Sequence, residues 1–229
     1  AYGDGQAVIA PIEFAAPPSG NGGYYSINGY SAAAANNCGI KITNGNVDAT
    51  LIEYGYWDTG NQPHCEYRYL ELSGPYGTGD YDSGSTPNSY GVYLHGNSGA
   101  YDTHHTLFSH CYIHGVTTMF QDGTGNDSMT VEYCELCDSR DVGADHGNIY
   151  WCGSDNLVFR FNKVHNYNVE GIFSGDGFNT TGWRIYGNTF YDAAGDGCKA
   201  VQIYEGNTAT DCLIYNNSFI DIPAPIVLQ

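Results

Sequence analysis

The chain has 229 residues, enough for one domain of ordinary size, and no run of it is apolar enough to span a bilayer. Its formal net charge is −18, from seven Lys and Arg against 25 Asp and Glu. This balance argues against nucleic acid and membranes as partners and favours cations. Ala1 to Asp4 has neither the basic start nor the apolar stretch of a signal peptide, so we expect that a secreted, extracellular form has already lost its signal.

The first 39 residues contain Ala-rich and Gly-rich stretches around two short apolar runs, Ile12–Phe14 and Tyr24–Ile27. They contain no amphipathic helix of the kind that covers the open end of a stack of strands. We therefore expect residues 1–39 to form irregular first coils of the repeat that follows.

From Ile40 onward a ten-residue pattern recurs: apolar, any, apolar, any, any, small or polar, any, apolar, any, polar. Its copies start at residues 40, 65, 106, 129, 157, 183 and 212, at intervals of 25, 41, 23, 28, 26 and 29 residues. Repeats of this length are typical of solenoids. Within each copy the apolar residues alternate with period two and are interrupted once, which predicts two short strands joined at a bend.

A second type of strand precedes most copies, so that each coil holds three short strands. It is found at Gly91–Gly96, Thr118–Gly123, Asn148–Gly153, Gly171–Asp176 and Ala200–Glu205. The chain thereby resembles the right-handed parallel β-helix superfamily, the pectate-lyase-like solenoids, whose coils read GIxLxG…N..IxxNxIxN. The resemblance implies an all-β, right-handed parallel β-helix (β-solenoid) of about seven to nine coils, with residues 1–229 in a single domain. It implies less about function, because this scaffold carries unrelated activities.

Alternation also predicts which side chains form the core, since a slip of one residue would expose them all. One inward column is expected at Ile42, Tyr67, Phe108, Val131, Phe159, Ile185 and Ile214, and a second at Val47, Leu72, Ile113, Leu136, Val164, Phe190 and Phe219.

Residues 75–89 are predicted to form an inserted loop, because they fill most of the 41-residue interval and are rich in Gly, Pro and Asp. Asp80 and Asp82, followed by Gly84, are similar to half of a calcium-binding loop, which makes calcium the one cofactor that the sequence suggests. The remaining acidic ligands are missing from this stretch, and a solvated surface loop is the simpler interpretation.

Two of the eight cysteines, Cys111 and Cys134, fall in the small-residue position of consecutive copies. Because neighbouring parallel strands lie roughly 4.8 Å apart, this pair is a candidate disulfide in an oxidising compartment. The alternative is a ladder of buried free thiols that replaces asparagine.

On the second type of strand, one aromatic residue per coil is expected to point outward: Tyr93, Phe120, Tyr150 and Phe173. Such a strip can bind sugar rings or pack laterally against another molecule. The alternative is a ladder that stacks on itself and only stiffens the helix.

Carboxylates and a histidine near this strip are the candidates for catalysis, because neighbouring coils would place carboxylates roughly 5–9 Å apart, as glycoside hydrolysis requires. The triplet Asp145-His146-Gly147 resembles a fragment of the glycosidase motifs on this fold, but the paired Asp-Asp and Arg-x-Lys elements are absent from the sequence. Solvated acidic residues at solenoid bends are the alternative. The candidates are Asp122, Asp145, His146, Asp176 and Glu205.

Lyases of the superfamily use an Arg or Lys as base, together with calcium to neutralise a uronate. Lys163 and Arg184 are the candidates for that role. However, Lys163 is expected one coil above Glu135, and Arg160 one coil above Glu132, at the spacing of cross-strand ion pairs.

A further column contains residue types that bind zinc or copper, His114, Cys137 and His165. Side chains stacked one above another do not converge on one ion, so these are interpreted as incidental polar positions on an outward face.

Three short motifs fit the N-glycosylation pattern, at Asn126, Asn179 and Asn216, and Asn179 is best placed on a bend.

Two functions follow as hypotheses. The first is a secreted, non-catalytic structural solenoid, a filament subunit that stacks end to end through its uncapped first coil and the strand at Ala224–Gln229. The second, implied by the resemblance, is a polysaccharide-processing enzyme (a lyase or a glycoside hydrolase) or a carbohydrate-binding module. The expected partners are accordingly other copies of the chain and a polysaccharide.

Overall fold

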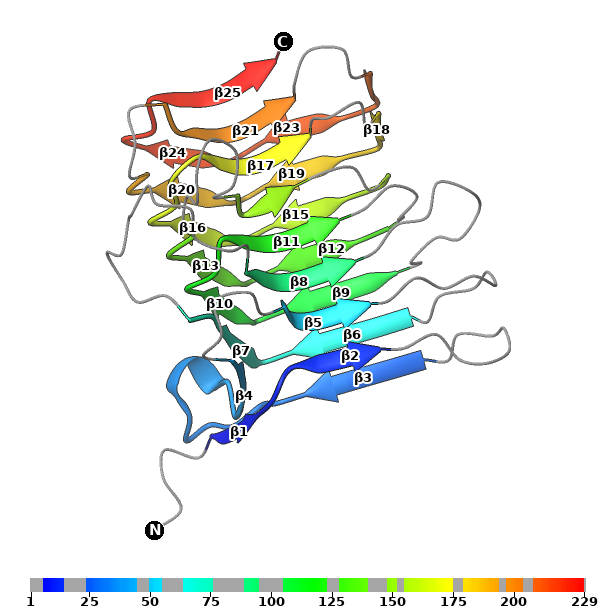
Figure 1. The fold of residues 1–229 in the computed structure, drawn as a ribbon. Coiled ribbons are helices and arrows are strands. Elements are labelled where there is room, and N and C mark those ends of the chain that lie inside the picture. The colour runs from blue at the N-terminus through cyan, green and yellow to red at the C-terminus, as the bar shows by residue number, and fades with distance from the viewer. Residues whose placement is uncertain are drawn as a thin grey trace.

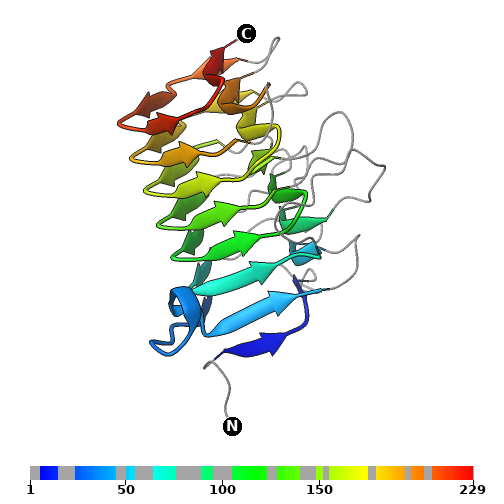
Figure 2. The same cartoon turned by 90° about the vertical axis from the view of Figure 1, so that its left-hand side faces the viewer.

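The computed structural model is an all-β, right-handed parallel β-helix in which the chain winds through three long parallel sheets (Figures 1 and 2). It describes residues 6–14, 24–44, 50–54, 64–75, 89–94, 105–122, 128–139, 148–151, 155–174, 179–193, 197–203 and 208–228. Over these ranges the helical structure is a single short 3₁₀ turn, η1 (Ala35–Asn37), and no helix in them is long and apolar enough to cross a membrane.

Each coil contributes one strand to each of three sheets, stacked in chain order. Sheet A contains β1 (Ala7–Ile9), β4 (Ile40–Thr43), β7 (Leu70–Ser73), β10 (Tyr112–His114), β13 (Glu135–Cys137), β16 (Lys163–His165), β20 (Thr189–Tyr191) and β24 (Ser218–Ile220). Sheet B contains β2 (Ile12–Phe14), β5 (Thr50–Tyr54), β8 (Tyr90–Leu94), β11 (Thr118–Asp122), β14 (Tyr150–Trp151), β17 (Glu170–Ser174), β21 (Lys199–Ile203) and β25 (Ala224–Leu228). Sheet C contains β3 (Tyr24–Asn28), β6 (His64–Arg68), β9 (Thr106–Ser109), β12 (Thr130–Glu132), β15 (Val158–Arg160), β19 (Arg184–Tyr186) and β23 (Leu213–Tyr215). The short strands β18 (Thr180–Thr181) and β22 (Ala209–Thr210) form a fourth pair.

The two predicted core columns are present, with one exchange. Tyr67, Phe108 and Val131 lie in register in sheet C, and Leu72, Ile113 and Leu136 lie in register in sheet A, all buried. Ile42 is buried as expected but pairs with Leu72 in sheet A, so the prediction placed it in the wrong column. The reason is that Ile40–Thr43 is the second strand of its coil and not the first. Val47 lies outside the described residues.

The first coil is more regular than the sequence predicted. Strands β1, β2 and β3 pair in register with β4, β5 and β6, respectively. The irregular part of this region that the structure describes is residues 29–39, which contain η1 and an antiparallel bridge between Tyr30 and Cys38. Residues 76–88 of the predicted inserted loop, including Asp80 and Asp82, lie outside the described residues.

The bend between sheets C and A explains the interruption in the repeat. Its first residue has the left-handed backbone conformation in coil after coil, at Tyr69, His110, Tyr133, Phe161, Gly187 and Asn216. Its second residue points inward, and in the later coils it is Asn162, Asn188 or Asn217. Asn162 Nδ2 donates a hydrogen bond to Val131 O at 2.9 Å, and Asn188 Oδ1 accepts one from the backbone N–H of Asn162 at 2.9 Å. This amide ladder fixes each bend to the coil on either side of it.

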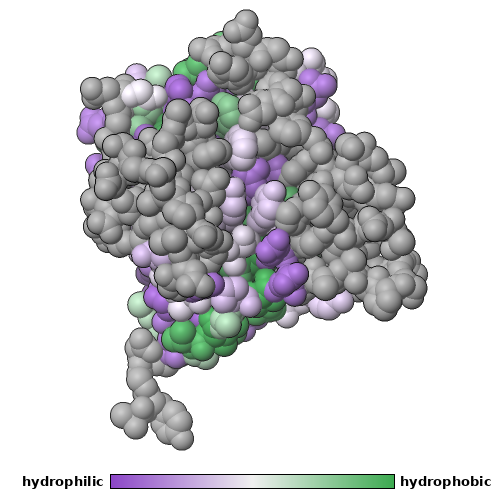
Figure 3. Space-filling model, viewed as in Figure 1, coloured by the Kyte–Doolittle hydropathy of each residue, from purple (hydrophilic) through white to green (hydrophobic). Residues whose placement is uncertain are grey.

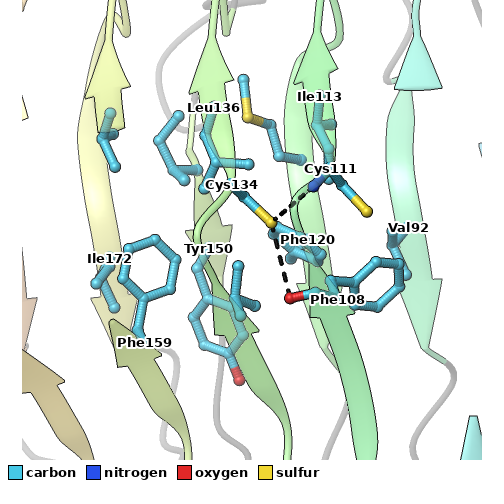
Figure 4. Packing of buried hydrophobic residues seen from close by; sticks show 14 of the residues in the cluster. Val92, Phe108, Cys111, Ile113, Phe120, Cys134, Leu136, Tyr150, Phe159 and Ile172 are labelled. Carbon is cyan, nitrogen blue, oxygen red and sulfur yellow. Dashed lines mark hydrogen bonds between the residues drawn. The ribbon is translucent and has the colours of Figure 1, made fainter. Parts of the chain in front are cut away.

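Cys111 and Cys134 continue the same ladder as free thiols, so the predicted disulfide is not present. Cys134 Sγ lies 3.7 Å from Phe108 O and 3.4 Å from the backbone N of Cys111, as Figure 4 shows. Burial raises the pKa of the Cys134 thiol, and the neighbouring Cys111 raises it further. The thiol therefore stays protonated, and its S–H has two acceptors within reach, Glu132 O at 3.2 Å and Phe108 O, the carbonyl that corresponds to the acceptor of the asparagine amide.

Candidate functional site

The outer face of sheet B carries the candidate site, because each of its strands turns two consecutive residues inward and leaves the flanking residues outside. In β8 the inward residues are Gly91 and Val92: a Cβ on Gly91 would lie 3.1 Å from the core atom Ile113 Cγ2, and Val92 is itself in the core. The flanking Tyr90 and Tyr93 therefore share the outer face, where their rings stack with centroids 5.0 Å apart.

Because two consecutive residues of each strand point inward, the predicted aromatic strip is wrong. Phe120 and Tyr150 are fully buried among the core residues (Figure 4), whereas Tyr93 and Phe173 are half-buried on the outer face. The register places Gln121 beside Tyr93 and Trp151 beside both Gln121 and Phe173. The prediction assumed that inward and outward residues alternate strictly along each strand, and so combined residues of an inward column with residues of an outward column. The outward column in register is Glu13, Glu53, Tyr93, Gln121, Trp151, Phe173, Gln202 and Val227.

A second outward column runs beside it, through the residue that precedes each inward pair. Its members include Tyr90, Thr118, Asn148, Glu170 and Lys199. We call seven residues of the two columns the sheet B strip: Tyr93, Thr118, Gln121, Asn148, Trp151, Phe173 and Gln202. Figure 3 shows that the described residues visible on this side form a narrow, mostly hydrophilic band along the long axis.

Four side chains of the sheet B strip are buried yet have an oxygen atom without a hydrogen-bond partner among the residues that the structure describes. The atoms are Thr118 Oγ1, Gln121 Oε1, Asn148 Oδ1 and Gln202 Oε1, and the residues are 0%, 8%, 1% and 3% exposed. Buried polar atoms are almost always paired, because leaving one unpaired costs about 1–3 kcal/mol. Nothing in the repeat pattern singled out these residues, although amides and a threonine on an outward column are visible in the sequence.

Asp122, the one predicted catalytic carboxylate that the structure describes, faces the interior. It is fully buried, and its Oδ2 accepts a hydrogen bond from Tyr150 OH at 2.6 Å. It is therefore not on the outer face where an acid or base was expected. Asp145, His146, Asp176 and Glu205 lie outside the described residues.

Most basic side chains are held in ion pairs that join one coil to the next. Arg184 Nη2 lies 2.9 Å from Asp211 Oδ2, and Arg160 Nη2 lies 2.5 Å from Glu132 Oε2. Arg160 Nη1 also donates to Tyr186 OH at 3.0 Å, and these contacts with Tyr186 and Glu132 raise the pKa of the guanidinium. Lys163 lies beside Glu135 as predicted, but it is exposed and forms no ion pair with a described residue.

On the outer face of sheet A, two histidines contact glutamate carboxylates of the preceding coil. His114 Nε2 lies 3.2 Å from Glu71 Oε1, and His165 Nε2 lies 3.2 Å from Glu135 Oε1. The Glu71 carboxylate also accepts hydrogen bonds from Lys41 and Gln6, and with His114 these donors lower its pKa to about 2.

The column of His114, Cys137 and His165 is in register as predicted. Its histidines are engaged with glutamates, and burial raises the pKa of the Cys137 thiol. No group of three metal-ligating side chains comes together in the described ranges.

An exposed aromatic ladder follows the left-handed bend between sheets C and A, where the repeat pattern allows any residue. The rings of Tyr69, His110, Tyr133 and Phe161 stack at centroid distances of 4.8, 5.0 and 5.1 Å. Tyr133 and Phe161 are 49% and 42% exposed. A bulky side chain in this backbone region costs about 1 kcal/mol, which stacking of about 0.5–1.5 kcal/mol per pair offsets. The self-stacking that was the alternative interpretation of the predicted strip is thus found at a different corner.

Two of the predicted glycosylation sites are on the surface. Asn179 and Asn216 are exposed, and Asn179 Oδ1 accepts a hydrogen bond from the backbone N of Thr208 at 2.9 Å. Asn126 lies outside the described residues.

Comparison of the chain with models of protein families, with characterised proteins and with solved structures gave no match.

Proposed function

We propose that the protein is an extracellular, non-catalytic solenoid of the pectate-lyase-like type that binds a polysaccharide chain along the sheet B strip. The observation that carries this proposal is the set of four buried oxygen atoms that have no hydrogen-bond partner in the described part of the chain. They lie on the same face as the half-buried rings of Tyr93, Trp151 and Phe173. Aromatic surface combined with a few placed polar atoms is the usual composition of a site for a small or extended ligand.

The contacts of the basic residues support a binding role over lyase chemistry. A lyase needs a basic side chain that can take a proton from the substrate. Arg184 is bound to Asp211, and Lys199, beside the sheet B strip, lies 3.1 Å from Glu170 Oε1. Lys163 is unpaired among the described residues but lies on sheet A, away from the sheet B strip.

This function is tested by incubating the purified protein with a panel of soluble polysaccharides and measuring both binding and turnover. We expect retardation in an affinity gel with at least one polymer, and no release of reducing ends or unsaturated uronides, with or without calcium. Turnover that is lost in Lys163→Ala or Arg184→Ala would show that the protein is a lyase.

A second role, end-to-end assembly, is favoured by where apolar side chains are exposed. Val8 and Ile9 on the first coil, and Ile226 and Leu228 on the last, are among the large hydrophobic residues that are exposed. Strands β1, β2 and β3 and strands β23, β24 and β25 are the outermost described strands of their sheets. We propose that copies pair through these edges, which gives a heterologous contact and hence a fibre. Electron microscopy of native material distinguishes filaments from dispersed molecules, and its intact mass shows whether further coils of the same chain cover these edges instead.

A further inference from the structure

The residues of the aromatic ladder, Tyr69, His110, Tyr133 and Phe161, occupy a backbone position where large side chains are strained. A bend of the same left-handed conformation follows strands of sheet A. There the position holds residue types that tolerate this conformation: Gly115, Asp138, Asn166, Asp192 and Asp221. The corner between sheets C and A therefore differs from the corner after sheet A, because four of its bends carry rings.

The rings are not needed to close this corner. In the next two coils the same position holds Gly187 and Asn216, and sheets C and A keep their register through both. Tyr133 and Phe161 are nevertheless 49% and 42% exposed. A strained position that carries exposed rings in successive coils, where the fold forms without them, indicates a contact surface.

The strands on either side of the aromatic ladder carry little net charge, although the formal net charge of the chain is −18. The strands of sheets A and C together contain five of the seven Lys and Arg, and four Glu. Three of these carboxylates, Glu66, Glu71 and Glu132, are paired with a cation. Two copies of so acidic a molecule repel one another, and this side is where they approach with least repulsion.

Stacking within the aromatic ladder determines which partner fits it. Tyr69 and Tyr133 cover the two faces of His110, and His110 and Phe161 cover the two faces of Tyr133. The ladder therefore presents ring edges, whereas sugar rings pack on ring faces. Edges carry the positive part of the aromatic quadrupole and pack well against another ring or against oxygen atoms of a protein surface.

The spacing of the rings favours a second copy of the same chain. Successive centroids are 4.8, 5.0 and 5.1 Å apart, so a partner that contacts every ring needs the repeat of the coils themselves. With about half of each ring exposed, four rings of about 150–250 Å² supply roughly 300–500 Å² per copy, which is the size of a weak contact.

From these observations we propose that the aromatic ladder is a lateral contact between two copies of this chain. A twofold axis across the corner places ladder against ladder, in an isologous contact that closes as a dimer. This surface is separate from the sheet B strip and from the end strands, so the proposal depends on neither role above.

The test is sedimentation equilibrium of the full chain from about 10 µM to about 1 mM, the range in which so small a contact dissociates. We expect a monomer–dimer equilibrium. Added salt should strengthen it, because salt screens the repulsion between the two acidic chains. Tyr133→Asn and Phe161→Asn should each weaken the dimer about 5- to 10-fold. The control is Tyr24→Asn, a ring outside the ladder that is 64% exposed, which should leave the dimer unchanged.

Asparagine is chosen because it adopts the left-handed conformation readily, as Asn216 does, so the variants should fold. Urea unfolding checks this. If the original protein stays monomeric over the whole range, or if both ladder variants dimerise as it does, the proposal is overturned. A lowered unfolding midpoint in the variants of such a monomer would assign the ladder to stiffening of the coil stack.

The same variants distinguish this contact from the other two roles. End-to-end assembly gives species larger than a dimer that the ladder variants do not affect. Loss of polysaccharide retardation in the ladder variants, with an unchanged dimer, would make the ladder a sugar contact and overturn the proposal. A blank affinity gel would remove the polysaccharide function and leave the lateral contact standing.

Discussion

Cys134 in one coil and Asn162 in the next perform the same task. Cys134 Sγ contacts Phe108 O at 3.7 Å, and Asn162 Nδ2 donates to Val131 O at 2.9 Å; Phe108 and Val131 are register partners. Asn162 Oδ1 in turn accepts a hydrogen bond from the backbone N of Cys134 at 2.9 Å. The thiol is therefore a member of the amide ladder, at a bend position where the sequence has cysteine in place of asparagine.

This equivalence predicts that Cys134→Asn is tolerated and Cys134→Ala is not. Asparagine keeps a donor for Phe108 O, so its free energy of unfolding should stay within about 1 kcal/mol of the original. Alanine removes the donor and leaves a small cavity, with a loss of about 1–3 kcal/mol. Urea unfolding measures both, and equal losses for the two variants would contradict the shared role. Because the thiols are free, a reducing agent should change neither midpoint.

The Glu71 network predicts a loss of stability in acid. With His114, Lys41 and Gln6 as donors, the pKa of Glu71 falls from an ordinary 4.5 to about 2. Since the folded pKa is the lower one, the carboxylate stabilises the fold above about pH 4.5, and this contribution is lost as the pH falls towards 2. Glu71→Gln should therefore destabilise the protein by roughly 2–3 kcal/mol at pH 7, and the difference should shrink between pH 4.5 and pH 2.

The control for that series is Glu13→Gln, an exposed carboxylate on sheet B, which should change stability by less than about 0.5 kcal/mol at neutral pH. A constant difference between Glu71→Gln and the original protein from pH 7 to pH 2 would show that the carboxylate is not the titrating group.

Arg160 and Arg184 offer a matched comparison of a partly buried and an exposed ion pair. Glu132, the partner of Arg160, has a side chain only 12% exposed, whereas that of Asp211 is 68% exposed. Arg160→Met should destabilise by about 2 kcal/mol, because it leaves the Glu132 carboxylate with Ser109 Oγ as its donor and no cation, and also removes a donor to Tyr186. Arg184→Met should cost less than about 1 kcal/mol. Equal effects in chemical unfolding would contradict the assignment of these pairs.

Gly187 should be indispensable to the aromatic ladder. Its φ is +69°, and a Cβ there would lie 2.6 Å from Phe161 Cδ1. Gly187→Ala should therefore cost about 2–3 kcal/mol, of which about 1 kcal/mol is backbone strain that any L-residue would introduce. In a Phe161→Ala background the same change should cost only that strain. A double-mutant cycle measures the coupling, and a coupling of zero would show that the ring does not lie over the glycine.

Sequence periodicity predicted the fold well, because a repeat that buries one residue in two leaves little freedom in register. It identified the bend position shared by Cys111, Cys134, Asn162, Asn188 and Asn217, although it could not decide between a disulfide and free thiols. That choice depends on side-chain direction at the bend, which spacing alone does not encode.

The sheet B strip was missed for a different physical reason. The double inward turn at Gly91-Val92, and at Met119-Phe120 in the next coil, breaks the period of two within a single strand. Strict alternation therefore predicted Phe120 and Tyr150 on the outer face, where the structure has Gln121 and Trp151. The sequence could not predict which buried oxygens lack a partner among the described residues, because hydrogen bonding of a buried atom depends on how the side chains pack.

A crystal structure of the full chain soaked with an oligosaccharide of the polymer that the affinity gel retards tests most directly whether the sheet B strip is a sugar-binding surface. We expect a sugar chain that lies along the axis over Trp151 and Phe173. A sugar bound on another face would contradict this role of the sheet B strip.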